Sequence, residues 1–157
     1  MSTNAIYDTS AVIDEPGGEW GLPRLGFNAL PEKVKTWLAL NRLRIEIVPA
    51  CEDHRAARDV PAARGWHGFC RRDLSAIVVR LDCAPSTLCH EVAHAIDFRL
   101  GNTSSGDRWG RLQAEWLDAD EEPCESFAKA FAAWCLDSTQ VPHDVALYFR
   151  RLVDGLF

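Results

Sequence analysis

The chain has 157 residues, 47% of them hydrophobic and 25% charged, with a formal net charge of −6 at pH 7. This length suits one domain with a real hydrophobic core, and no apolar run is long enough for a membrane helix. The basic residues form no cluster or stripe, so we expect no nucleic acid and no membrane as a partner.

The N-terminus and the cysteines indicate the compartment. Residues 1–8 lack the basic and apolar regions of a secretory signal peptide. The six cysteines include no Cys-x-x-Cys pair, and we expect them to be reduced thiols. We therefore expect a cytoplasmic protein, with a phage-borne protein or an exported effector as the alternatives.

The N-terminal half alternates between loop and regular structure. Residues 1–25 are polar and then rich in glycine and proline, which predicts an extended arm before a domain over residues 26–157. Apolar residues at helical spacing predict a helix over residues 31–41. Alternating and β-branched residues predict three short strands, over residues 43–48, 66–70 and 75–81. The last two strands are close enough in sequence to form a hairpin.

The C-terminal half is predicted to be helical. Pro85 opens a helix that should run to about Leu100, with Gly101 as its stop. Three further helices are predicted over residues 108–118, over residues 123–136 and from residue 142 onward. We therefore expect an α+β fold, in which a short twisted sheet packs on the helix that begins at Pro85 and C-terminal helices complete the domain.

A His-Glu-x-x-His motif lies within that helix, at residues 90–94. His90 and His94 are four residues apart, so both imidazoles lie on one face of the helix and can bind one metal ion. Glu91 lies on the open side of such a site, where a carboxylate can act as a general base toward water. This spacing is typical of zinc metallopeptidases, so we expect Zn²⁺ as the cofactor.

A catalytic zinc usually has a third protein ligand, and no histidine follows His94 until His143. The carboxylate candidates are Asp97, Glu115, Asp118, Asp120, Glu121, Glu122 and Glu125. Asp97 lies almost one turn beyond His94, which suits a partner that orients a ligand. Glu125 lies in the first turn of a predicted helix whose same face carries small residues, Ala128 and Ala132, that allow close packing. The alternative is that Glu125 only complements the dipole at the start of its helix.

Two motifs together resemble a known family. His90-Glu91-Val92-Ala93-His94-Ala95-Ile96-Asp97 is followed by Glu125-Ser126-Phe127-Ala128-Lys129-Ala130-Phe131. This pair resembles the anthrax lethal factor-like zinc metallopeptidases, gluzincins that include the Pro-Pro endopeptidases. The resemblance covers roughly residues 65–136. It implies a zincin-like domain that hydrolyses peptide or protein substrates, with His90, His94 and Glu125 as zinc ligands and Glu91 as the base.

One position departs from this family. The family has a tyrosine seven residues before the third ligand that stabilises the oxyanion, and this chain has Asp118 there. The candidate substitutes are Arg108, Arg111, His143 and Tyr148. The departure favours an alternative function, a zinc-binding regulatory or interaction module that cleaves little. Cys89 and Cys124 each precede a predicted ligand, so the two thiols are also expected to lie near each other.

Overall fold

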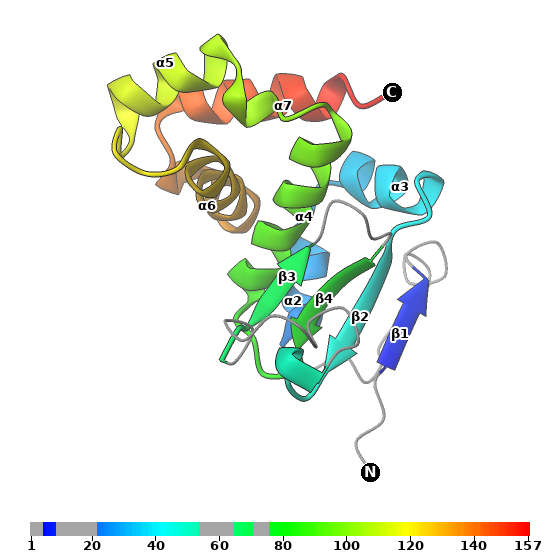
Figure 1. The fold of residues 1–157 in the computed structure, drawn as a ribbon. Helices are drawn as coiled ribbons and strands as arrows, with labels where there is room; N and C mark the ends of the chain where they lie inside the picture. The colour runs from blue at the N-terminus through cyan, green and yellow to red at the C-terminus, as the bar shows by residue number, and fades with distance from the viewer. Residues whose placement is uncertain (1–4, 9–21, 54–64, 71–75) are drawn as a thin grey trace.

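The fold of the chain is α+β. The computed structural model describes residues 5–8, 22–53, 65–70 and 76–157. A mixed sheet lies on one side of a long central helix, and three C-terminal helices lie on its other side and around its end (Figure 1). The sheet has the strand order β1-β2-β4-β3, formed by β1 (Ala5–Asp8), β2 (Arg44–Val48), β4 (Ala76–Arg80) and β3 (Gly68–Cys70).

The sheet confirms the three predicted strands and adds a fourth. Strand β3 is antiparallel to β4, as the predicted hairpin requires, and β4 is parallel to β2. Residues 71–75, which join the two strands of this hairpin, lie outside the described residues. Strand β1 was not predicted, because we placed residues 1–25 in an arm. It pairs antiparallel with β2, with Ala5 opposite Ile47 and Tyr7 opposite Ile45, so this part of the arm belongs to the sheet.

The central helix is α4 (Pro85–Arg99), which carries the His-Glu-x-x-His motif. It is buried on nearly all sides, at Leu88, Cys89 and residues 91–97, because the sheet, α2 and α6 all pack against it. A helix covered on several faces needs apolar residues all round, which explains its sequence. The predicted stop is confirmed, since Gly101 follows the C-cap residue Leu100 and has a φ of 78°.

The other helices surround α4. Four of them confirm predicted helices within one or two residues, and α2 was not predicted. Their bounds are α2 (Pro23–Ala29), α3 (Glu32–Leu40), α5 (Asp107–Trp116), α6 (Pro123–Leu136) and α7 (His143–Asp154). Of the helices in the described ranges, none has both the length and the apolar character needed to cross a membrane.

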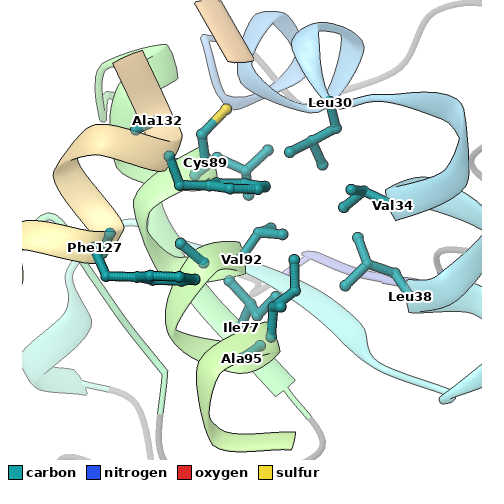
Figure 2. Close-up of a cluster of buried hydrophobic side chains, with 14 of the residues drawn as sticks. Leu30, Val34, Leu38, Ile77, Cys89, Val92, Ala95, Phe127 and Ala132 are labelled. Carbon is teal, nitrogen blue, oxygen red and sulfur yellow. The ribbon is translucent and has the colours of Figure 1, made fainter. Parts of the chain in front are cut away.

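The main core connects the sheet to the C-terminal helices through α4. Figure 2 shows Val92 and Ala95 of α4, Ile77 of β4 and Phe127 of α6 within one cluster of buried side chains. Beyond α6, the Trp109, Phe127 and Phe149 rings pack with centroids 5.3–5.5 Å apart, joining α5, α6 and α7. Such aromatic contacts stabilise a defined geometry, so they fix α5, α6 and α7 against one another.

Candidate metal centre

The two motif histidines converge on one point of the α4 surface. The Nε2 atoms of His90 and His94 lie 3.1 Å apart, and the ring centroids are 4.7 Å apart in an edge-on arrangement. His94 is buried, and its ring stacks on the Phe98 ring one turn further along α4 at 5.9 Å. This stacking holds the His94 imidazole in place, as a metal ligand requires.

Helix α6 brings Glu125 to the same point. Its Oε2 atom lies 3.2 Å from Nε2 of His90, and its Oε1 atom lies 3.0 Å from Nε2 of His94. Ala128 and Ala132 are buried on this helix, so the small side chains do lie at the packed face, as expected from the sequence. Glu125 itself sits at the open end, with 44% of its side chain exposed.

The three side chains fit a zinc ion chemically. Donor atoms held tetrahedrally at roughly 2.0–2.2 Å from zinc lie about 3.3–3.6 Å apart. The observed separations of 3.0–3.2 Å are only slightly shorter. Two imidazole nitrogens and one carboxylate also form a donor set that catalytic zinc accepts, with a fourth position left for water or substrate.

Glu125 is the carboxylate that meets the histidines. In the part of the chain that the structure describes, one group of three histidine, cysteine or acidic side chains has possible ligand atoms that all lie within 4.8 Å of one another, and its members are His90, His94 and Glu125. The other six carboxylate candidates, all of them described residues, do not join this group. The residues alone left seven carboxylates as candidates for the third ligand. The packing of α6 on α4 narrows these candidates to Glu125.

Glu91 faces the same cavity. The side chain is almost fully buried, with the residue 7% exposed, and it lines a cavity of about 430 Å³ together with His90, His94 and Glu125. Burial and the nearby Glu125 carboxylate raise the pKa of Glu91 to about 8. Burial, and then the neighbouring His94, lower the pKa of His90 below its ordinary value. A neutral His90 at physiological pH is the form that binds a metal.

The rest of the cavity wall was not predicted as part of the site. It is formed by Trp66, Gly68, Phe69, Cys70, Phe98 and Cys124. Phe98 could have been found from the sequence, because it lies four residues after His94 on the same helix face. The part of the wall that β3 forms could not have been found from the sequence, because its position depends on how that strand packs on α4. There a Cβ atom on Gly68 would lie only 3.2 Å from Cγ of Glu91, so β3 passes directly beside the predicted base.

The predicted oxyanion donors lie elsewhere. Tyr148 is buried among aromatic rings of the core, and its hydroxyl lies 3.3 Å from Oγ1 of Thr103. Arg108 and Arg111 line a different cavity, between α5 and α7, and His143 is exposed at the start of α7. None of the four lines the cavity of the candidate metal centre. They are therefore poor substitutes for the family tyrosine.

Two other expectations differ from the structure. Asp97 accepts hydrogen bonds from the backbone N–H and the hydroxyl of Ser104, and no described hydrogen bond joins it to His90 or His94. Cys89 does not approach Cys124. Its thiol instead donates a hydrogen bond to the Gly26 carbonyl at 3.3 Å and interacts with Cys135, eleven residues after Cys124 on α6. That separation corresponds to about 16 Å along a helix.

In comparisons with known proteins, no family model matches this chain, and no curated protein matches it either. Function is therefore inferred from the residues of the candidate metal centre and their geometry.

Proposed function

We propose that this protein is a zinc-dependent peptidase with a zincin-like domain of the gluzincin type. His90, His94 and Glu125 would hold the zinc ion, and Glu91 would be the general base. The observation that carries the proposal is the meeting of these three side chains, from two different helices, at the wall of a cavity that Glu91 also lines. If the His-Glu-x-x-His motif had arisen by chance, nothing would require a third possible ligand and a buried carboxylate to lie beside the two histidines.

The zinc ion and the protein would supply different parts of the chemistry. A bound zinc ion would supply Lewis acidity, which lowers the pKa of water and polarises the substrate carbonyl group. Glu91 would take a proton from the attacking water and pass it to the nitrogen of the leaving amine, so that one peptide bond breaks and one water is consumed. With a pKa of about 8, Glu91 is mostly protonated at pH 7 without a nearby cation. A positive charge in the cavity favours its ionised form, which is the basic form.

The cavity wall favours a peptide as the substrate. Among the described strands, β3 is the edge of the sheet beside the site, and an extended peptide can add to such an edge through main-chain hydrogen bonds. Trp66 and Phe69, whose ring centroids are 5.7 Å apart, supply an apolar surface for its side chains.

One observation favours the alternative, a zinc-binding module without efficient hydrolysis. In the described lining of the cavity there is no tyrosine, lysine or arginine side chain that could stabilise an oxyanion. Loss of one such donor costs roughly 10²–10³ in rate. The buried Glu91 supports the peptidase instead, because a purely structural zinc site needs no base.

The decisive experiment combines metal analysis with peptide cleavage. We expect about one zinc per chain by elemental analysis, and cleavage of a random peptide library by the wild type. The Glu91→Gln variant should keep its zinc and lose the cleavage, because it retains the shape of the carboxylate without its basicity. Zinc without cleavage in the wild type would support the module. A wild type that takes up no zinc would contradict both functions.

A further inference from the structure

A second cavity, of about 450 Å³, adjoins the candidate metal centre. It lies between the first turns of α4, at Ser86 and Thr87, and the second half of α6. His90 lines this cavity as well as the first one, so the two cavities adjoin at this residue. The α6 wall contains Ala132, Ala133 and Leu136, and we call this second cavity the alanine pocket.

The alanine pocket offers apolar surface, because its charged groups already have partners. The Asp137 carboxylate accepts hydrogen bonds from the backbone N–H and the hydroxyl of Thr139, at 3.0 and 2.6 Å. The ammonium group of Lys129 forms an ion pair with Glu121. Leu136, in contrast, is 44% exposed although it is a large apolar residue. A polar ligand group would lose hydration here and find no free ionic partner, whereas an aliphatic group would cover exposed carbon.

The position of the pocket suggests what occupies it. In an extended peptide, successive side chains point to opposite sides of the chain. A peptide whose scissile carbonyl lies near His90 would therefore direct one neighbouring side chain toward the first cavity and the next toward the alanine pocket. The volume of the pocket lies within the range of about 300–1,000 Å³ that is typical of ligand sites, and it exceeds the needs of one aliphatic side chain.

We propose that the alanine pocket binds an aliphatic side chain of the substrate, next to the bond that is cleaved, and that Ala133 and Leu136 determine this specificity. The small Ala133 leaves the space that the substrate side chain fills, and Leu136 covers it. This inference rests on the proposed peptidase function. It adds the substrate class, a peptide with a leucine-like residue at that position.

The test measures binding without requiring cleavage. The full chain is labelled with ¹³C at its alanine methyl groups and titrated with N-acetyl-leucinamide or N-acetyl-glycinamide. We expect the leucine probe to shift the Ala132 and Ala133 methyl signals in a saturable way. The glycine probe should bind about tenfold more weakly or worse, because it lacks the side chain whose burial drives binding. Equal affinity for the two probes, or shifts confined to alanines elsewhere, would overturn the proposal.

Three variants localise the effect. Ala133→Trp fills the pocket and should abolish the saturable shift of the Ala132 methyl signal. Leu136→Asp places a charge at an exposed position beside the pocket and should weaken the leucine probe at least tenfold without disturbing the core. Ala114→Trp is the matched control, because Ala114 is exposed on α5 and lines a different cavity, so binding should persist. Undiminished binding to Leu136→Asp would overturn the proposal even if Ala133→Trp failed to fold.

The same samples separate this inference from the proposed function. Probe binding together with absence of zinc and cleavage would retain the alanine pocket as an apolar site and contradict the peptidase. Zinc binding and cleavage without a methyl shift, and with no preference for aliphatic residues in the peptide library, would retain the peptidase and contradict the specificity proposed for the pocket.

Discussion

Asp97 and Ser104 are joined by two hydrogen bonds that close the end of α4. The Asp97 carboxylate accepts the backbone N–H of Ser104 at 2.7 Å and the Ser104 hydroxyl at 2.6 Å. Asp97 is 1% exposed and Ser104 is 2% exposed, so these bonds form away from water. The carboxylate therefore anchors the segment after α4, and no described hydrogen bond joins it to His90 or His94. Asp97, the last residue of the motif at residues 90–97, therefore has a structural role in this chain.

The variant Asp97→Ala tests that role. It leaves the Ser104 N–H buried without its partner, and hydrogen bonds to a charged group are worth about 1.5–3 kcal/mol each. We expect the free energy of unfolding in urea to fall by about 2–4 kcal/mol, since the two bonds are not fully additive. Asp120→Ala, at an exposed position of the same charge, should change it by less than about 0.5 kcal/mol.

Zinc content distinguishes an anchor from a residue that orients a ligand. Folded Asp97→Ala should still contain about one zinc per chain. A variant with unchanged stability and strongly weakened zinc binding would show that Asp97 acts on the histidines after all.

Glu125→Ala tests the third ligand. Removing a residue that hydrogen-bonds to a metal ligand already weakens metal binding roughly 10–100-fold. Removing the ligand itself should therefore weaken metal binding by a larger factor. We expect the zinc affinity, measured by competition with a chelator, to fall more than 100-fold. Glu122→Ala is the matched control, because it removes the same charge three residues earlier at an exposed position.

The two outcomes for Glu125 are clearly separate. Equal zinc affinity in Glu125→Ala and Glu122→Ala would mean that the carboxylate only contacts the two imidazoles and binds no metal. The candidate centre would then need another ligand.

Tyr148→Phe tests whether the distant tyrosine replaces the one that is absent at position 118. The Tyr148 hydroxyl lies at Thr103 and the ring packs on Trp109 at 5.3 Å, in the core rather than in the cavity. We expect zinc content to be unchanged and the rate of peptide cleavage to stay within about twofold, with a stability loss of about 1 kcal/mol for the hydrogen bond. A 100-fold fall in rate, with the fold intact by circular dichroism, would place its hydroxyl in the reaction.

The parts of this molecule that the sequence predicted are those encoded locally. Helix α4 has a proline at its start and a glycine at its end, and the two histidines share a face through spacing alone. Strand β1 was missed because its four residues acquire a strand conformation only by pairing with β2. Glu125 could be chosen from the residues alone only as one of seven carboxylates. The selection depends on how α6 packs on α4, a tertiary relationship that no local pattern contains.

Helix α2 was missed for a related reason, and it yields a further prediction. We interpreted the glycines and prolines around residue 25 as part of an arm, but Gly26 lies where α2 touches the start of α4. A Cβ atom there would overlap the Pro85 carbonyl oxygen and lie 3.1 Å from Cβ of Leu88. We expect Gly26→Ala to lower the free energy of unfolding by about 1–3 kcal/mol through overpacking.

Gly110→Ala gives the opposite expectation on α5. No atom lies within 4 Å of a Cβ there, and alanine favours an exposed helix over glycine by up to about 1 kcal/mol. The two substitutions are chemically identical, so unfolding in urea should move in opposite directions. Stabilisation by Gly26→Ala would contradict the close contact between α2 and α4.

The buried thiols make stability sensitive to alkaline pH. Burial raises the pKa of Cys83 from its ordinary value of 9.0 to about 12, because the thiolate is disfavoured in the core. Below pH 9 the thiol is protonated in both the folded and the unfolded chain, so its contribution is constant. Above pH 9 the unfolded chain releases the proton first, and each further pH unit up to about 12 lowers the free energy of unfolding by at most about 1.4 kcal/mol. Comparing wild type with Cys83→Ala at pH 8 and pH 10.5 isolates this effect. The wild type should lose more stability than the variant between these two pH values, and parallel losses would show that Cys83 ionises as freely in the folded chain as in the unfolded one.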